Sequence, residues 1–486
     1  MTDGLDDVYG GSLALLTDLY QLTMACGYWK SGESDREAVF HLTFRRAPFG
    51  GGYAVCAGLA QAMAYLERLR FDDSDLAYLA TLRDRENQPL FPKGFLDYLG
   101  GLKFACTVDA VPEGSLVFAH EPVLRVTGPI AHAQLVETAL LTIINFQSLI
   151  ATKAARIVSA ARGAPVLEFG LRRAQGIDGG ISASRAAWIG GVAGTSNVLA
   201  GKLLGIPVAG THAHSWVMFH GDELAAFRSY AEALPGNCTF LVDTYDTLEG
   251  VHHAITVGRE LRAKGHELAG VRLDSGDLAH LSIEARRMLD EAGFPGAKIV
   301  ASNDLDEHLI ASLHEQGARI DSYGVGTRLV TAFDQPALGG VYKLGAYRDG
   351  NGWRDAIKLS EQPIKISNPG VLGVKRLWRA GEMVGDVIYD VERGYAGPSI
   401  HDIEHPVVPP YAPPHDQVEE LLFRAMDRGT RLPLPELAAA RARATRELAA
   451  LSPRTRRFLN PQPYPVGLDD KVHARKLQLV AEARHA

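Results

Sequence analysis

Short apolar runs alternate strictly with helix-like stretches between about residue 165 and residue 326. Six of these runs read as strands, at residues 166–170, 208–211, 238–243, 271–274, 298–303 and 320–326. Strands that alternate with helices build a parallel sheet, because each helix carries the chain back to the same edge. Polar side chains end nearly every run, which favours a closed α/β barrel over an open sheet, whose ligands gather at one switch point.

The segments on either side of this alternation have a different character. Residues 1–150 mix strand-like and helix-like pieces, which is typical of an α+β domain. We expect residues 151–338 to form the barrel and the short strands within residues 339–414 to return to the first domain's sheet. Residues 415–486 are rich in Ala, Arg, Glu and Leu, and they read as a helical region.

Composition excludes several classes of protein. The net charge of -7 gives no basic footprint for nucleic acid or for an anionic membrane. The four cysteines lie far apart, which suits reduced thiols in a cytoplasm. The acidic N-terminus does not look like a signal peptide, and no apolar run reaches the roughly 18 residues of a membrane span.

The run at residues 269–277 ends in a polar group. An apolar strand leads directly into Arg272, Asp274, Ser275 and Asp277. The carboxyl ends of barrel strands are where barrel enzymes keep their chemistry. We therefore predict an enzyme.

Two loops are suited to phosphate. One strand delivers Ser302 and Asn303 to a turn where Asp304 could cap the next helix. The following strand ends in a loop where two glycines allow close backbone approach and a threonine adds a hydroxyl donor; these residues are Gly324, Gly326 and Thr327. Barrels often bind phosphate at their last two loops. The two loops together are therefore stronger evidence for a phosphate site than either loop alone.

Two carboxylates at strand ends suggest polyol or metal binding. Asp243 and Asp274 could hold ribose hydroxyls or, through water, a magnesium ion that bridges phosphates. The alternative is that they cap helices or pair with Arg272 and Arg172.

Two adjacent arginines, Arg172 and Arg173, follow the first strand of the barrel. A guanidinium can bind a carboxylate or a phosphate through two hydrogen bonds. Because successive side chains diverge, we expect one of the two to point into the site and the other to be structural.

A third cluster contains two histidines. His212 and His214 have the spacing of a barrel hydrolase metal pair, but such a site needs further histidines at other strand ends. Those ends offer Glu168, Asp243 and Asn303, with no histidine. A histidine beside phosphate loops could instead act as a nucleophile or an acid/base group, and the role of His212 is open.

Seven segments together resemble one family. They are LLTDLYQLTMA (15–25), FRRAPFGG (44–51), GLRRAQG (170–176), SNVLAG (196–201), GTHAHS (210–215), VRLDSGD (271–277) and GGVYKL (339–344). In this order they resemble the nicotinate phosphoribosyltransferases, over nearly the whole chain. The resemblance implies a type II phosphoribosyltransferase fold: an irregular α/β barrel beside an α/β sandwich built from both chain ends. It also implies a homodimer with shared active sites.

The resemblance further implies a reaction in NAD salvage. Nicotinate and phosphoribosyl pyrophosphate would give nicotinate mononucleotide and pyrophosphate, with Mg²⁺ as cofactor and with ATP hydrolysed as co-substrate, as in an ATP-coupled ligase. His214 matches the histidine that ATP phosphorylates. Tyr20 would stack on the pyridine ring from the partner subunit, and Phe169 matches a second ring contact.

The remaining roles follow from the same match. Thr211 and Arg272 would contact nicotinate. Asp243 and Asp274 would bind the ribose hydroxyls and organise magnesium. The 5-phosphate would be received by Gly324, Gly326 and Thr327.

Three alternatives are compatible with parts of the sequence. Nicotinamide-specific relatives carry an aspartate after a Gly-Thr pair, where this chain has Ser196 after Gly194 and Thr195. A carboxylate there would repel nicotinate, so the serine favours the acid. Quinolinate enzymes need a more basic pocket and lack the GTHAHS element. A catalytically silent nucleotide-binding homologue is disfavoured because the motif positions are intact.

Overall fold

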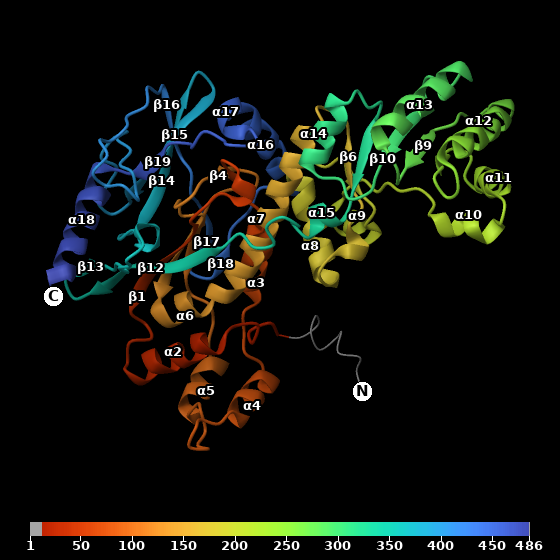
Figure 1. Ribbon diagram of the computed structural model, residues 1–486. Coiled ribbons are helices and arrows are strands. Elements are labelled where there is room, and N and C mark those ends of the chain that lie inside the picture. The colour runs from red at the N-terminus through yellow and green to blue at the C-terminus, as the bar shows by residue number, and fades with distance from the viewer. Residues whose placement is uncertain (1–11, 486) are drawn as a thin grey trace. The chain divides into compact units, whose positions relative to one another are not determined.

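The computed structural model describes residues 12–485, which fall into two compact units (Figure 1). Residues 150–336 form the second unit. The described residues before and after that range form the first, so both chain ends belong to it. The boundary near Leu149 and Ile150 falls inside a single long helix, α7 (Glu137–Ala160).

The second unit is built on a parallel six-stranded sheet. Its order is β7-β6-β11-β10-β9-β8. The strands are β6 (Val166–Glu168), β7 (Gly194–Thr195), β8 (Thr239–Leu241), β9 (Gly270–Leu273), β10 (Lys298–Ala301) and β11 (Ser322–Val325). The helices between them are α8 (Ile177–Ile189), α9 (Val198–Leu204), α10 (His214–His220), α11 (Glu223–Ala233), α12 (Thr247–Ala263), α13 (Leu278–Glu291), α14 (Glu307–Glu315) and α15 (Thr327–Val330).

Aspartates begin four of these helices. The carboxylates that accept backbone N–H bonds from the first turns of α11, α12, α13 and α14 belong to Asp222, Asp246, Asp277 and Asp306. Such caps satisfy amides that have no partner inside the helix. The cap of α14 is therefore Asp306 and not Asp304, because the backbone at Asn303 and Asp304 turns through positive φ angles of 93° and 40° first.

One expected strand is only a bridge. The sequence pattern predicts a strand at residues 208–211, but in the structure Val208 makes a single parallel bridge to Thr195. The sixth strand is instead β7, which is two residues long. Beyond Ala209, whose N–H donates to Thr195, the backbone leaves the sheet to reach α10. Among the described residues, no backbone ladder joins this segment to β8.

The first unit contains a seven-stranded antiparallel sheet from both parts of the chain. Its order is β13-β12-β1-β5-β3-β17-β18. The strands are β1 (Glu37–Phe44), β3 (Thr107–Ala110), β5 (Leu124–Pro129), β12 (Gly340–Asp349), β13 (Gly352–Asp355), β17 (Phe423–Asp427) and β18 (Thr430–Arg431). Burial alternates little along β1, whose side chains from Ala38 to Leu42 are all buried. A strand covered on both faces reads as a continuous apolar run.

Smaller elements complete this unit. A second sheet has the order β16-β14-β15-β19, and β2 pairs with β4. These strands are β2 (Ala54–Val55), β4 (Leu116–Val117), β14 (Leu372–Arg379), β15 (Glu382–Asp390), β16 (Gln417–Glu420) and β19 (Val466–Leu468). The helices are α2 (Leu19–Lys30), α3 (Leu59–Arg68), α4 (Asp73–Thr81), α5 (Lys93–Gly100), α6 (Ile130–Leu135), α16 (Leu437–Ala450), α17 (Pro453–Arg456) and α18 (Asp470–His485).

The mixed α/β class is as predicted, but the tail is not only helical. Residues 415–485 hold four strands besides their three helices. The strands are two to five residues long, and they pair with distant partners such as Asp109 and Lys375. Their composition did not reveal them because the pairing, and not the local sequence, makes them strands.

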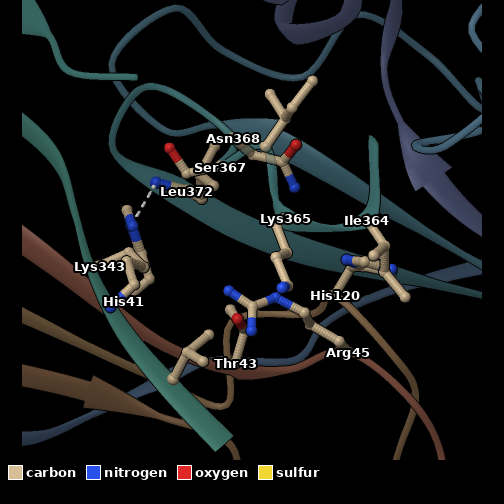
Figure 2. Close-up of a pocket in the computed structure, with 12 residues that line it drawn as sticks. His41, Thr43, Arg45, His120, Lys343, Ile364, Lys365, Ser367, Asn368 and Leu372 are labelled. Carbon is tan, nitrogen blue, oxygen red and sulfur yellow. Dashed lines mark hydrogen bonds between the residues drawn. The ribbon is translucent and has the colours of Figure 1, made fainter. Parts of the chain in front are cut away.

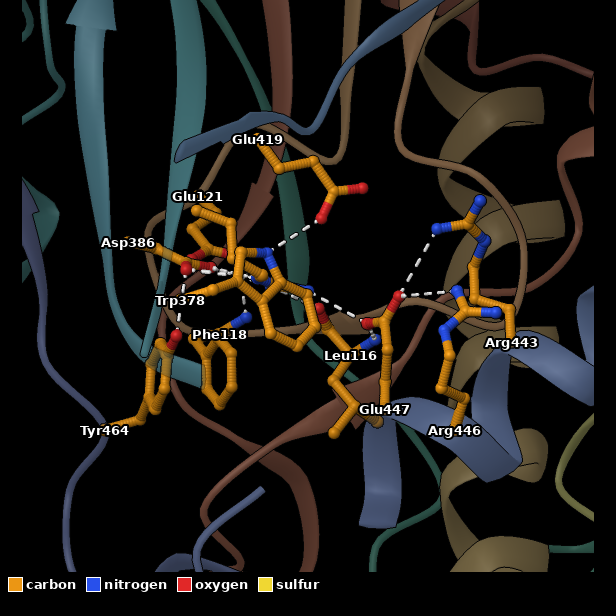
Figure 3. A network of polar contacts seen from close by, with 11 residues as sticks. Leu116, Phe118, Glu121, Trp378, Asp386, Glu419, Arg443, Arg446, Glu447 and Tyr464 are labelled. Atoms are coloured by element: carbon orange, nitrogen blue, oxygen red, sulfur yellow. Dashed lines mark hydrogen bonds and ion pairs between the residues drawn. The ribbon is translucent and has the colours of Figure 1, made fainter. Parts of the chain in front are cut away.

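A buried charge network joins these parts of the first unit (Figure 3). The guanidinium of Arg376 on β14 pairs with Asp386 on β15 at 2.7 Å and with Glu447 on α16 at 2.9 Å. The same group donates to the backbone oxygen of Leu116 at 2.7 Å. Glu121 is fully buried beside Asp386, and burial followed by that carboxylate raises its pKa well above the ordinary value.

Candidate active site

Arg272 lies at the centre of the polar groups at the strand ends. Its Nη1 donates to Thr211 Oγ1 at 3.0 Å, its Nε to Ser302 Oγ at 2.9 Å and its Nη2 to Asp274 Oδ1 at 2.9 Å. The hydroxyl of Ser302 also donates to Asp274. The arginine side chain is 13% exposed. Four residues predicted for the site are thus in direct contact, from three separate segments of the chain.

A second pair lies at the end of β8. His214 is the first residue of α10, and its Nε2 is 3.2 Å from Oδ1 of Asp243. The other oxygen of Asp243 accepts from Ser275 Oγ at 2.6 Å and from the N–H of Asp274 at 3.2 Å. The Asp243 side chain is 2% exposed, whereas that of His214 is 40% exposed. A fixed carboxylate therefore orients a histidine that solutes can reach.

Ser196 follows a buried polar cluster. The carboxylate of Glu168 accepts from Thr195 Oγ1 at 2.6 Å and from Ser184 Oγ at 2.8 Å. The backbone oxygen of Glu168 accepts from the N–H of Ser196 at 2.9 Å. Glu168 thereby fixes the end of β7 that carries Ser196. One sequence signal points to this structural role, an acidic residue inside the apolar run Val-Leu-Glu-Phe.

Phe169 and Gly324 depend on each other. A Cβ atom on Gly324 would lie 2.5 Å from Cδ2 of the Phe169 ring, so only glycine leaves room for the ring. The guanidinium carbon of Arg272 lies 5.8 Å from the centre of that ring. Phe169 therefore borders the Arg272 group, and the glycine at position 324 has a packing reason beside its predicted role in phosphate binding.

The other predicted residues of this unit lie in turns or at the start of a short helix. Asn303 is exposed, in a turn with positive φ, while Gly326 and Thr327 begin the short helix α15. Arg172 and Arg173 lie on a single 3₁₀ turn, Leu171–Arg173, and both are exposed. Their contact with a substrate stays a prediction.

Tyr20 belongs to the first unit. It lies on α2 and is 48% exposed. Burial of part of the ring, followed by the charge of Glu137, raises the pKa of the phenol. Its predicted stacking on a substrate bound by the partner subunit is not tested by its position.

His212 is a packed side chain. It is 7% exposed, and its ring lies against the rings of Phe227, Tyr230 and Phe240. Its Nε2 accepts the backbone N–H of Leu241 at 3.2 Å. Burial lowers the pKa of this imidazole, which keeps Nε2 free to accept.

Cationic side chains line a pocket in the first unit (Figure 2). Arg45, Lys343 and Lys365 face it, together with His41 and His120. Burial lowers the pKa of Lys343, and the charge of Arg45 lowers it further. Cations held together against their repulsion are suited to an anion. The sequence assigned no role to this group, although Arg45 and Lys343 lie within the segments FRRAPFGG and GGVYKL.

The carboxylates fit an indirect magnesium site. Oδ2 of Asp243 and Oδ1 of Asp274 already accept protein hydrogen bonds. No described residue donates to Oδ2 of Asp274, whose side chain is 25% exposed. Residues 12–485 contain no cluster of three or more metal-binding side chains of the His, Cys, Asp and Glu types. The carboxylate oxygens of Asp243 and Asp274 suit a magnesium ion that keeps its waters and is held chiefly by phosphates.

A membrane span is not found in the part of the chain that the structure describes. No helix there combines the length and the apolar character needed to cross a bilayer. All four cysteines are free thiols.

Comparison with known proteins gives a consistent result. Three family models match: the nicotinate phosphoribosyltransferase N-terminal domain at residues 15–145, the nicotinate phosphoribosyltransferase family at residues 165–363 and the C-terminal domain at residues 375–476. A nicotinate phosphoribosyltransferase of Bacillus subtilis is 44% identical over 485 residues, covering 97% of this chain and 96% of the relative. The human relative of that name is 37% identical over 520 residues, with 95% of each chain covered.

Solved structures agree with these matches. The crystal structure of human nicotinic acid phosphoribosyltransferase has a TM-score of 0.83 and 33% identity, covering 95% of this chain and 99% of that chain. A nicotinate-nucleotide pyrophosphorylase from Pyrococcus furiosus, at 22% identity and a TM-score of 0.68, shares the fold. The chain belongs to the nicotinate phosphoribosyltransferase family.

Proposed function

We propose that this enzyme joins nicotinate to phosphoribosyl pyrophosphate and couples the reaction to ATP through phosphorylation of His214. Nicotinate and phosphoribosyl pyrophosphate follow from the family, and the coupling is our proposal. The observation that carries the coupling is the half-exposed His214 held 3.2 Å from the buried carboxylate of Asp243. A histidine in this setting has an oriented ring and an accessible nitrogen.

Nicotinate would bind beside Arg272. The guanidinium is a charged hydrogen-bond donor that suits a carboxylate, and the ring of Phe169 lies next to it. The hydroxyl of Thr211 accepts from the guanidinium and donates to the oxygen of His212 at 3.0 Å, and it would turn its proton to the ligand instead. Ser196 places no negative charge near the end of β7. These features favour the acid over the amide, because position 196, where an aspartate would repel the carboxylate of nicotinate, holds a serine.

The displacement would develop positive charge on the ribose. As the pyridine nitrogen forms its bond to the anomeric carbon, the bond to pyrophosphate breaks and the sugar passes through an oxocarbenium-like state. Asp243 and Asp274 would stabilise that charge and hold the ribose hydroxyls. Mg²⁺ on the phosphates would reduce the charge of the leaving pyrophosphate.

The phosphorylation step uses the ring orientation of His214. Nε2 faces Asp243, and a carboxylate only accepts hydrogen bonds. Nε2–H would therefore donate a hydrogen bond to Asp243, and the lone pair of the neutral ring would lie on Nδ1. Nδ1 would attack the γ-phosphorus of ATP, forming an N–P bond as the P–O bond to ADP breaks. Water would later cleave the N–P bond and return phosphate and imidazole. The added negative charge would tighten the site on magnesium and substrate.

The assembly that we propose is a homodimer. Val198, Leu199 and Leu203 on α9 are exposed apolar side chains that a second copy could cover. In this proposal Tyr20 and the pocket around Lys343 act on a substrate bound by the partner subunit, where the cations would neutralise its phosphates. The unpaired thiols and the net charge of -7 are consistent with a cytoplasmic enzyme.

The test is release of pyrophosphate from phosphoribosyl pyrophosphate and Mg²⁺, with nicotinate or nicotinamide, each with and without ATP. We expect turnover with nicotinate that ATP raises. Turnover with nicotinamide alone would overturn the assignment of the acid. Turnover with nicotinate that ATP does not change would overturn the coupling.

A further inference from the structure

The ring of His212 fills a gap in the sheet of the second unit. The segment around Val208 pairs with β7, and no backbone ladder joins it to β8 among the described residues. The N–H of Leu241, on β8, instead donates to Nε2 of His212 at 3.2 Å. A side chain thus takes the place that a neighbouring strand's carbonyl would occupy.

The packing leaves this ring little freedom. The centres of the Tyr230, Phe227 and Phe240 rings lie 5.1, 5.8 and 6.2 Å from that of His212. Nδ1 lies 3.4 Å from the oxygen of Ala213, which places the ring proton on Nδ1. The unprotonated Nε2 can then accept from Leu241, as the geometry requires.

Both ends of this hydrogen bond are next to residues of the site. Thr211 immediately precedes His212, and His214 is two positions after it. Leu241 is two positions before Asp243. A short backbone segment moves with a side chain that is anchored. The bond of His212 therefore restrains the distance from His214 to Asp243 and the distance from Thr211 to Arg272.

We propose that His212 is a positioning residue, which holds the 211–214 loop on β8 so that His214 meets Asp243 and Thr211 meets Arg272. It does not touch the substrate itself. The part of this inference that concerns His214 rests on the proposed coupling to ATP.

Two substitutions separate the hydrogen bond from the packing. His212→Phe keeps a ring among the aromatic neighbours but leaves the Leu241 amide without an acceptor. His212→Gln places an amide oxygen at the distance of Nε2 and restores the acceptor. His220→Phe, on the same helix as His214, is the matched control, since its ring bonds only within α10.

The measurements are incorporation of the labelled γ-phosphate of ATP into the protein, the ratio of turnover with and without ATP, and KM for nicotinate. Thermal unfolding shows whether each variant is folded. For His212→Phe we expect labelling and the ATP ratio to fall about tenfold or more and KM for nicotinate to rise several-fold, in the range seen when groups that orient a site are removed. His212→Gln and His220→Phe should stay near wild type.

The outcomes distinguish this inference from the proposed function. Wild-type labelling and KM in folded His212→Phe would overturn it, as would an equal loss in folded His212→Gln. If the wild type takes no label, the coupling to ATP fails. KM for nicotinate then decides the inference alone, because Thr211 and Arg272 do not depend on ATP.

Discussion

Nε2 of His214 and Oδ1 of Asp243 lie 3.2 Å apart, although 29 positions separate them in the chain. Asp243 is in turn held by the hydroxyl of Ser275 at 2.6 Å. The carboxylate is therefore fixed before any substrate arrives. This order of contacts resembles the way in which a carboxylate orients a catalytic or metal-binding histidine elsewhere.

Removing the imidazole should separate coupling from synthesis. In His214→Ala we expect no transfer of labelled γ-phosphate to the protein and a ratio of turnover with and without ATP close to one. The reason is that His214 is the histidine that contacts Asp243, whereas the nearby His212 is buried. Labelling that persists in this variant would contradict the assignment.

Changing Asp243 should slow the same step without removing its nucleophile. Asp243→Asn keeps the volume but can present an N–H to Nε2 and so favour the wrong ring tautomer. We expect the rate of His214 phosphorylation to fall by about 10–100-fold, as when other orienting carboxylates are lost. Rapid quenching after addition of labelled ATP measures this rate. A rate equal to wild type would show that Asp243 does not orient the ring.

Replacing Arg272 by lysine should weaken substrate binding. Lysine keeps the charge but cannot donate to Thr211, Ser302 and Asp274 together in the planar arrangement seen here. The loss of charged hydrogen bonds should cost about 1.5–3 kcal/mol, or roughly 10–150-fold in kcat/KM for nicotinate. Steady-state kinetics at saturating phosphoribosyl pyrophosphate measure it. An unchanged kcat/KM would remove Arg272 from the nicotinate site.

A methyl group at position 324 should displace Phe169. Gly324→Ala would place Cβ 2.5 Å from the ring. We expect a loss of about 1–3 kcal/mol in the free energy of unfolding from overpacking, with a higher KM for nicotinate. Denaturant unfolding and kinetics test both effects. Gly236→Ala is the control, because a Cβ there meets no atom within 4 Å, and equal behaviour of the two variants would contradict the prediction.

Glu121 should make the stability of the protein depend on pH. Burial first, and then the charge of Asp386, raise its pKa well above the ordinary value, so the folded chain binds a proton that the unfolded chain has already lost. The stabilisation is complete below the ordinary glutamate pKa and is lost as pH rises through the raised value. The slope for one proton is about 1.4 kcal/mol per pH unit.

Glu121→Gln should therefore flatten this decline. Denaturant unfolding of the wild type and the variant at a series of pH values measures the two slopes. Glu382→Gln, at an exposed position of β15, is the matched control and should keep the wild-type slope. Identical slopes for the wild type and Glu121→Gln would show that Glu121 does not hold the proton.

Sequence patterns were sufficient for the alternating unit but not for every strand. The runs that became β8, β9, β10 and β11 are apolar, and their burial matches the pattern that predicted them. β7 was missed because two residues, Gly194 and Thr195, carry no periodicity. The short strands of the tail were missed because pairing makes them strands: β17 pairs with β3, more than 300 positions away, and β18 forms only by pairing with β17.

The candidate site could likewise be predicted only in part from the sequence. Arg272, Asp274 and Ser302 are found together because strand ends of a parallel sheet meet at one edge. The packing of Phe169 on Gly324 and of His212 on β8 could not be predicted, since it depends on where the rings point. The network around Arg376 could not be predicted from the sequence either, because Leu116 is 260 positions from the arginine that donates to its backbone oxygen.

The seven-stranded sheet has a consequence for how the chain is made. In the order of synthesis, β1, β3 and β5 leave the ribosome long before β12 and β17, which cover the outer edges of β1 and β3. Until then these edges present unpaired N–H and carbonyl groups, the kind that recruit strands from other chains. The second unit is contiguous in the chain, so it can complete its own sheet before β12 and β17 of the first unit have been synthesised. A chain cut short after the second unit would be exposed to aggregation at those two edges.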